Sequence, residues 1–303
     1  MPTSFLRTAS RSRAVRSIHV RTDAMSENSH TALISVSALA DRLAAAARPV
    51  ILDVRWQVGR PPLRNDYLSA HIPGAHFVDL DEDLASSPGP GGRHPLPAPD
   101  DLQRSLRRWG IEPDSTVIVY DGNSSMAAAR AWWVLRWAGL ADVRVLDGGF
   151  RSWIERDQAV ESGPVTDAEG SVQVRPGGMP TLDADGAASH ADAGRLVDVR
   201  APERFSGAAE PIDPVAGHIP GAINQPTTEN INADGTFLSV ARLRQRFTDL
   251  DGAPVGVYCG SGVTAAHTVL AMHQAGIQAS LYPGSWSEWI TDPNRPVATG
   301  AAG

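Results

Sequence analysis

The 303-residue sequence contains no lysine, because all 27 of its basic side chains are arginine. Enzymes that form a Schiff base, including those that anchor pyridoxal phosphate, need a lysine amine, so this chemistry is excluded. Acidic side chains outnumber basic ones and give a formal net charge of −7. Nucleic acids and anionic membranes are bound through clustered positive charge, and we therefore expect neither as a partner.

Cysteine and long apolar runs are also scarce. The chain has one cysteine, Cys259, so no intrachain disulfide can form, and a reducing compartment, the cytoplasm, is expected. Because no Cys-Cys or His-x-x-x-His spacing occurs, we expect no metal site, and nothing in the sequence calls for a cofactor. No window holds 18 consecutive apolar residues, so no transmembrane helix is predicted.

The N-terminal segment has an unusual composition. Residues 1–24 are rich in arginine and serine and hold a single acid, Asp23. Organelle transit peptides share this composition, and that interpretation would place the protein in mitochondria. We favour a disordered tail over residues 1–30, with Met25 as a second candidate start, because no apolar periodicity predicts a packed element there.

The rest of the sequence contains an internal repeat. Four blocks recur in the same order: 50–55 and 195–200, 71–75 and 218–222, 117–121 and 255–259, and 149–153 and 285–289. Repetition at a near-constant offset indicates two homologous domains. We expect them to span 31–160 and 179–300. Between them, 161–178 is rich in glycine and proline and is predicted to be a linker, interrupted by a short strand at 171–175.

The pattern within each half predicts the fold. Runs that are apolar on both faces, such as 51–54, 117–120 and 255–258, alternate with helical stretches at 126–138 and 265–275. Strands buried between two helix layers require such runs. The predicted fold class is therefore α/β, with a parallel sheet and helices on both faces in each half. The ligand crevice of such sheets lies at the carboxyl ends of the strands, where Cys259 is placed.

Cys259 joins an apolar strand to the start of a helix. The N–H groups of the turn and the positive end of the helix dipole favour a thiolate there, which is the nucleophilic form. Glycines in the turn allow successive N–H groups to converge on an anion. The predicted anion-binding loop is Gly260, Ser261, Gly262, Val263 and Thr264. A lone cysteine is more often a small buried hydrophobic residue than a nucleophile, so the role of Cys259 depends on the evidence from the rest of the chain.

The repeat, the two His-Ile-Pro-Gly-Ala blocks and the segment Cys-Gly-Ser-Gly-Val-Thr-Ala at 259–265 together resemble the two-domain rhodanese family of sulfurtransferases, over about residues 33–297. The resemblance implies two tandem rhodanese-like domains, the second catalytic through Cys259. The first is then inert, because Asp121 stands at the equivalent position and a carboxylate cannot accept sulfane sulfur. The implied reaction moves sulfur from thiosulfate or 3-mercaptopyruvate, through a Cys259 persulfide, to cyanide or a thiol.

The resemblance also bears on the donor. Arg204 matches the arginine with which family members hold the donor's anionic group, a task suited to a guanidinium fork. Residues 260–262 resemble the 3-mercaptopyruvate branch, whereas the thiosulfate branch typically has cationic residues there. Against this, many members of the 3-mercaptopyruvate branch have a second arginine nine residues after the first, and here that position is Asp213. The donor therefore stays open.

Nine further side chains have a predicted role. By the same resemblance, Asp66 is a candidate partner for Ser261, although its register relative to His71 is poor. His71 and His218 occur in both halves while only one half has the thiol, so we expect them to stabilise turns. Six tryptophans at helical spacings are predicted to pack in the core or between domains: Trp132, Trp133, Trp137, Trp153, Trp286 and Trp289.

Two other functions are alternatives to sulfur transfer. Phosphatases with a cysteine in a similar turn need an arginine six residues after it to hold the phosphoryl oxygens, and here that position is Ala265. A sulfur carrier or regulatory module would accept a persulfide without turning over small donors. The intact loop and Arg204 argue against the carrier, and a steady-state assay with small donors separates the two.

Overall fold

The structure is a computed structural model that describes residues 1, 32–122 and 124–300. The expected N-terminal tail, the transit-peptide interpretation and Met25 lie outside the described residues. The described residues from 32 to 300 lie in one compact unit, which contains both halves of the repeat. Within the described part, no helix is long and apolar enough to cross a membrane, and no cluster of three or more His, Cys, Asp or Glu could hold a metal ion.

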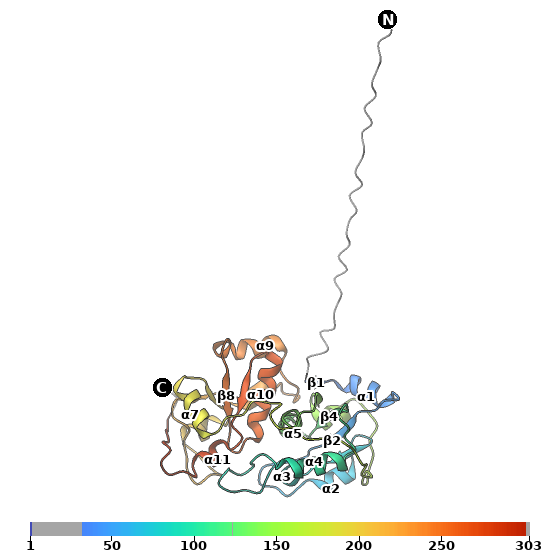
Figure 1. The fold of residues 1–303 in the computed structure, drawn as a ribbon, viewed down its shortest axis with the longest axis horizontal. Helices are drawn as coiled ribbons and strands as arrows, with labels where there is room; N and C mark the ends of the chain where they lie inside the picture. The colour runs from blue at the N-terminus through green and yellow to red at the C-terminus, as the bar shows by residue number, and fades with distance from the viewer. Residues whose placement is uncertain (2–31, 123, 301–303) are drawn as a thin grey trace. The chain divides into compact units, whose positions relative to one another are not determined.

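The first half has a five-stranded parallel sheet with the order β1-β5-β4-β2-β3. Strands β1, β2 and β4 are labelled in Figure 1. Its strands are β1 (Leu33–Ile34), β2 (Val50–Asp53), β3 (Ala75–Phe77), β4 (Thr116–Tyr120) and β5 (Asp142–Leu146). Its helices are α1 (Val36–Ala44), α2 (Arg64–Ser69), α3 (Leu80–Asp83), α4 (Pro99–Arg108), α5 (Met126–Trp137) and α6 (Gly149–Glu155).

The second half has a four-stranded parallel sheet with the order β7-β6-β8-β9. Its strands are β6 (Leu196–Asp198), β7 (Ile223–Asn224), β8 (Val255–Tyr258) and β9 (Ala279–Leu281). Its α-helices are α7 (Ala184–Asp192), α8 (Pro202–Ser206), α9 (Val240–Arg246), α10 (Val263–Ala275) and α11 (Ser285–Trp289). Two 3₁₀ turns, η1 (Thr227–Asn230) and η2 (Thr248–Leu250), complete it.

The repeat in the sequence is also a repeat in the sheets. Strands β2, β3, β4 and β5 occupy the same relative places as β6, β7, β8 and β9. In place of a strand equivalent to β1, Thr181 forms a single parallel bridge with Leu281 of β9. The parallel α/β fold predicted for both halves is confirmed.

The segment at 161–178, predicted as a linker, packs against the first half. The backbone N–H groups of Val172 and Arg175 donate to the carbonyls of Ile111 and Ala138, and Val172 is buried. These acceptors lie just after α4 and α5 rather than on a sheet edge, so no ladder forms. The predicted strand at 171–175 is therefore wrong.

The recurring Asp-Val-Arg and His-Ile-Pro-Gly blocks form one buried frame in each half. The Tyr120 hydroxyl donates to the Asp53 carboxylate at 2.5 Å and accepts the Ile72 N–H at 3.1 Å. The Arg55 guanidinium pairs with the same carboxylate at 3.0 Å. A buried carboxylate needs such partners to remain charged, so these residue types recur together.

His71 and His218 occupy equivalent places beside these frames. The Nδ1 atom of His71 lies 2.9 Å from the carbonyl oxygen of Tyr67, and that of His218 lies 2.8 Å from the carbonyl oxygen of Phe205. Each ring stacks on the aromatic side chain whose carbonyl it contacts. This geometry fits the turn-stabilising role predicted for both.

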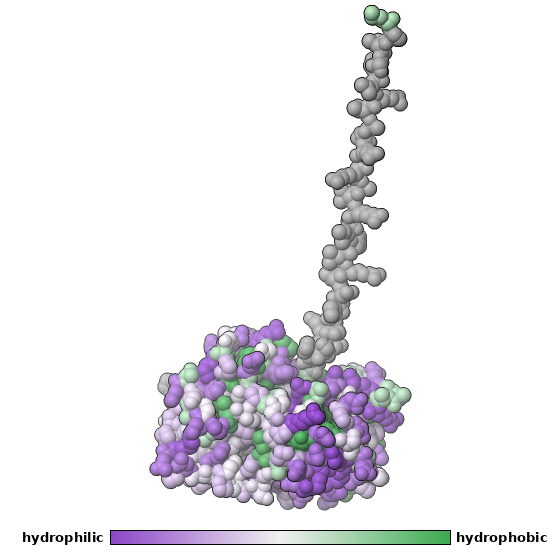
Figure 2. Space-filling model, viewed as in Figure 1, coloured by the Kyte–Doolittle hydropathy of each residue, from purple (hydrophilic) through white to green (hydrophobic). Residues whose placement is uncertain are grey.

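Helices α5 and α10 contact each other and join the two halves through a shared core (Figure 1). Ala131 and Trp132 of α5, with Ala266 and Val269 of α10, are among its buried members. Five of the six tryptophans predicted to pack are buried, namely Trp132, Trp133, Trp153, Trp286 and Trp289, while Trp137 is half-buried against this core. Hydrophilic residues dominate the face of the described part that Figure 2 shows.

Candidate active site

Cys259 directly follows β8, at the carboxyl end of the second sheet. Its thiol is free and the residue is only 2% exposed. The Cys259 N–H donates to the Ser285 hydroxyl at 3.2 Å, and its carbonyl accepts the Trp286 N–H at 3.0 Å. Ser285 has φ +52°, a strained value for a residue with a side chain. The backbone of the cysteine is thus fixed to the start of α11.

The loop after Cys259 bends its backbone toward the sulfur. The Gly262 N–H donates to Cys259 Sγ at 3.1 Å. Gly262 has φ +79°, and a β-carbon there would lie 2.2 Å from the Pro283 carbonyl oxygen, so only glycine fits. Because α10 begins at Val263, directly after Gly262, its positive N-terminal end lies at this loop. Both features favour a sulfur anion.

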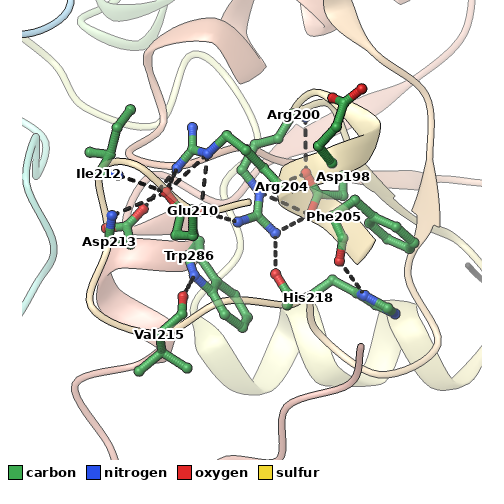
Figure 3. Close-up of polar contacts among 12 residues, drawn as sticks. Asp198, Arg200, Arg204, Phe205, Glu210, Ile212, Asp213, Val215, His218 and Trp286 are labelled. Atoms are coloured by element: carbon green, nitrogen blue, oxygen red, sulfur yellow. Dashed lines mark hydrogen bonds and ion pairs between the residues drawn. The ribbon is translucent and has the colours of Figure 1, made fainter. Parts of the chain in front are cut away.

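Arg204, on α8, is held by two buried carboxylates (Figure 3). Its Nε donates to both oxygens of Glu210 at 3.1 and 3.0 Å, and its Nη2 donates to Glu210 at 2.8 Å and to Asp213 at 3.0 Å. Its Nη1 has no hydrogen-bond acceptor within residues 32–122 and 124–300. A β-carbon built on Gly260 would lie 3.4 Å from that nitrogen. The unoccupied edge of the guanidinium therefore lies over the cysteine loop.

A second arginine reaches the same loop from the first half. Arg93 lies between α3 and α4, and its Nη1 forms an ion pair with Asp213. Its backbone N–H donates to the Ser287 hydroxyl of α11 at 3.0 Å. A β-carbon built on Gly260 would lie 2.9 Å from Arg93 Nη2. Asp213 therefore bridges two arginines that belong to different halves.

A third arginine, Arg130 of α5, is completely buried behind the loop. It donates to four backbone carbonyls at 3.1–3.4 Å, those of Leu84, His94, Pro95 and Gly262. No carboxylate forms an ion pair with it among the residues that the structure describes. Burial lowers the pKa of Arg130 to about 10, while the nearby Cys259 acts in the opposite direction. A charged guanidinium thus lies beside the cysteine loop.

Asp66 is the residue predicted as a partner of Ser261. It is on α2 and lines a cavity of about 500 Å³ together with Asp121 and Thr264. Ser261 is not among the described residues that line this cavity. The cavity therefore brings Asp66 to Thr264 of the predicted loop, and the pairing of Asp66 with Ser261 stays a prediction.

Asp121, the counterpart of Cys259, has a different environment. Its carboxylate accepts three backbone N–H groups at the start of α5, those of Ser125 at 3.1 Å, Ala127 at 2.9 Å and Ala128 at 3.2 Å. In the first half, donors at the helix start are thus occupied by the protein's own carboxylate.

Sequence reasoning missed Arg93, Arg130, Glu210 and Ser285. One signal was present for Arg93, because two glycines precede it. Gly92 has φ +98°, and a β-carbon there would lie 2.7 Å from the Gly284 carbonyl oxygen, so this loop is packed tightly against the second half. No comparable local signal marks Arg130, since an arginine on a helix is ordinarily solvated.

The comparisons with known proteins address the family. The family model of the rhodanese-like domain matches this sequence twice, at residues 35–156 and 183–292. The chain belongs to the rhodanese family. SseB of Mycobacterium tuberculosis, provisionally named a thiosulfate sulfurtransferase, is 47% identical over 281 residues, which cover 89% of this chain and 98% of SseB.

Two further relatives of this rhodanese-family chain support the assignment. A Pseudomonas aeruginosa protein, provisionally named a 3-mercaptopyruvate sulfurtransferase, is 46% identical over 88% of this chain and 98% of its own length. The crystal structure of SseA from Escherichia coli matches with a TM-score of 0.74 at 32% identity and covers 85% of this chain and 100% of SseA. The predicted family and tandem fold are confirmed. The two sequence relatives are named for different donors.

Proposed function

We propose that this chain is a sulfurtransferase that takes sulfane sulfur from thiosulfate or 3-mercaptopyruvate onto Cys259 and passes it to cyanide or a thiol. One observation carries the proposal: a buried thiol accepts a backbone N–H at 3.1 Å, and the guanidinium of Arg204 lies over the next residue of its loop. A nucleophilic sulfur beside a cation suits a small anionic sulfur donor.

The first half-reaction loads the cysteine. With thiosulfate, the Cys259 thiolate attacks the outer sulfur, the S–S bond of the donor breaks, and its electron pair leaves with sulfite. With 3-mercaptopyruvate, the thiolate attacks the thiol sulfur and the C–S bond breaks. The electron pair then leaves as the enolate of pyruvate, which takes the persulfide proton. Either donor leaves an anionic persulfide on Cys259.

The second half-reaction unloads it. Cyanide attacks the outer sulfur of the persulfide and leaves as thiocyanate, which restores the Cys259 thiolate. The Gly262 N–H, the start of α10 and the Arg130 guanidinium are placed to stabilise the sulfur anion in both stages. In this proposal the first half, 31–160, does not carry sulfur, because Asp121 replaces the nucleophile.

Arg204 is the proposed donor-binding residue of the second half. Its free Nη1 edge lies against Gly260, the residue after Cys259, while Glu210 and Asp213 fix its other edges. Ser261 lies in the loop between the two glycines and is a candidate for contacting 3-mercaptopyruvate. A reducing compartment such as the cytoplasm would keep the thiol available between turnovers.

The mechanism predicts that Cys259→Ser abolishes transfer, since an oxygen there is a far weaker nucleophile at neutral pH. Parent protein incubated with either donor should gain one sulfur atom, about 32 Da, located on Cys259 by peptide mass spectrometry. The serine variant should keep the thermal unfolding midpoint of the parent within a few degrees. Activity in the variant, or sulfur on another residue, would contradict the proposal.

Steady-state rates with thiosulfate and with 3-mercaptopyruvate, using cyanide as acceptor, identify the donor. The same assay tests the alternative of a sulfur carrier. A carrier would be loaded by a partner protein and would show no turnover with either small donor.

A further inference from the structure

Asp213 is the starting point, because its buried carboxylate holds two cations that come from different halves of the molecule. Its side chain is 3% exposed, and its two oxygens contact Arg93 and Arg204 separately. Glu210 also pairs with Arg204, so two buried carboxylates lie against the two guanidinium groups. Like charges this close need such carboxylates between them. Asp213 and Glu210 thus fix the two arginines side by side, and any ligand must be bound by the nitrogens that they leave free.

Each of the two arginines has an edge that faces the cysteine loop. Arg204 Nη1 and Arg93 Nη2 have no hydrogen-bond acceptor in the described part of the chain, and both lie within 3.4 Å of a β-carbon position on Gly260. Gly260 is the residue next to the nucleophile. An anionic group between these edges would receive charge-assisted hydrogen bonds from both arginines while its sulfur faced Cys259.

The Arg93 side chain is not needed to anchor its own loop. The backbone N–H of Arg93 already bonds to Ser287, Gly92 packs on the Gly284 carbonyl, and Arg130 donates to the carbonyls that follow, those of His94 and Pro95. The guanidinium itself is paired with Asp213, and the Arg93 side chain is 30% exposed. This arrangement fixes a side chain while leaving part of it accessible to a ligand.

We propose that Arg93 is a donor-binding residue: the first half supplies a second guanidinium that holds the donor's anionic group together with Arg204, and Asp213 positions both. This inference rests on the proposed sulfur transfer and extends it. The recognised chemistry is an anionic group with at least two terminal oxygens near the transferable sulfur. The carboxylate of 3-mercaptopyruvate and the sulfonate of thiosulfate both supply it.

The test separates the two half-reactions. Single-turnover loading of Cys259 is followed by mass spectrometry with each donor, and discharge of the preformed persulfide to cyanide is followed separately. Arg93→Ala should lower the second-order loading constant about ten- to a hundredfold with at least one donor, as expected for a lost charge-assisted contact. Discharge should change less than about threefold, because the donor's anionic group has then left.

Three comparison variants support the interpretation. Arg204→Ala should show the same split between loading and discharge. Arg93→Lys should recover part of the loading rate, since it restores the charge but not the fork. Arg104→Ala, which removes an exposed arginine of α4 paired with Asp101, should load at the parent rate. If Arg93→Ala does not fold, Arg93→Lys and Arg93→Gln carry the test.

A binding measurement requires no turnover. Sulfite and pyruvate are the groups that leave after loading, and both should slow the alkylation of Cys259 by iodoacetamide in the parent. In Arg93→Ala, the same protection should require a concentration of sulfite or pyruvate about tenfold higher, for at least one of the two. If the parent gains no sulfur from either donor, the proposed function is wrong. The protection of Cys259 by sulfite or pyruvate would then still test whether Arg93 binds an anionic group. Unchanged loading with both donors, or an equal loss in loading and discharge, would overturn the role of Arg93.

Discussion

Arg130 is the residue whose placement is hardest to explain by stability alone. Its guanidinium is fully buried, is paired with no carboxylate among the described residues, and leaves its Nε without a partner. Removing a cation from water is costly, and carbonyl oxygens compensate only part of that cost. With its pKa lowered to about 10, the group nevertheless stays charged at neutral pH. Its natural counter-charge is the sulfur anion of Cys259.

We therefore predict that Arg130→Met slows the reaction of Cys259 with iodoacetamide at pH 7 by about tenfold, the factor that corresponds to about 1.4 kcal/mol of lost thiolate stabilisation. Arg130→Lys should fall between the parent and the methionine variant. Arg136→Met, on the same helix but with a guanidinium that bonds near the surface, is the matched control and should react like the parent. Parent-like alkylation in Arg130→Met would show that Arg130 acts only in packing.

The sequence allowed the second-half residues of the site to be predicted but not those from the first half. Cys259, its loop and Arg204 belong to local patterns that carry the family resemblance. Arg93 and Arg130 reach the loop only because the two halves pack together, and their positions depend on contacts that no local pattern encodes. In the sequence, Asp213 stands where many family members have a second arginine. In the structure, its carboxylate orients two other arginines, Arg93 and Arg204.

At the level of elements, α10 is fixed to η1 by a buried polar contact. His267 of α10 is completely buried, its Nδ1 lies 2.9 Å from the Thr227 hydroxyl, and its ring stacks on Phe237 at 4.5 Å. Burial lowers the pKa of His267 to about 3. The ring is therefore neutral in the folded protein throughout the physiological range.

This histidine should make the fold sensitive to acid. Between pH 6.5 and about 3, the unfolded chain binds a proton at His267 that the folded chain does not. The contribution of the neutral His267 ring to the free energy of unfolding is therefore complete above pH 6.5, and it falls by about 1.4 kcal/mol for each pH unit below 6.5. We predict that the difference in free energy of unfolding between the parent and His267→Gln shrinks by about 2–3 kcal/mol from pH 6.5 to 4.5. Urea unfolding at several pH values measures it. Parallel profiles for the two proteins would contradict the assignment.

Elements buried on both faces were predicted well, and the irregular connection was not. The helices expected at 126–138 and 265–275 correspond to α5 and α10, because each follows an apolar strand and a turn of small residues. The strand expected at 171–175 failed because its N–H groups bond to carbonyls after α4 and α5, and this choice of acceptor depends on tertiary packing.

At the scale of the whole molecule, the two sheets are linked by a shared interior. Helices α5 and α10 belong to one buried cluster that contains side chains from both halves. Two smaller clusters are confined to one half each, and they contain Leu39 in the first half and Leu196 in the second. The site itself needs both halves, because Arg93 and Asp213 meet across the contact. Loss of either half would therefore expose the shared core and disrupt the site.

We predict that the two halves unfold as one cooperative unit, because opening either one would expose the α5 and α10 faces to water. Leu39→Ala and Leu196→Ala each remove a fully buried side chain, at a cost of about 2–5 kcal/mol. Hydrogen exchange of the β4 and β8 amides measures the free energy of opening in each half separately. Each variant should lower it in both strands by the same amount. A loss confined to the strand of the mutated half would mean that the halves open independently and that the shared core does not couple them.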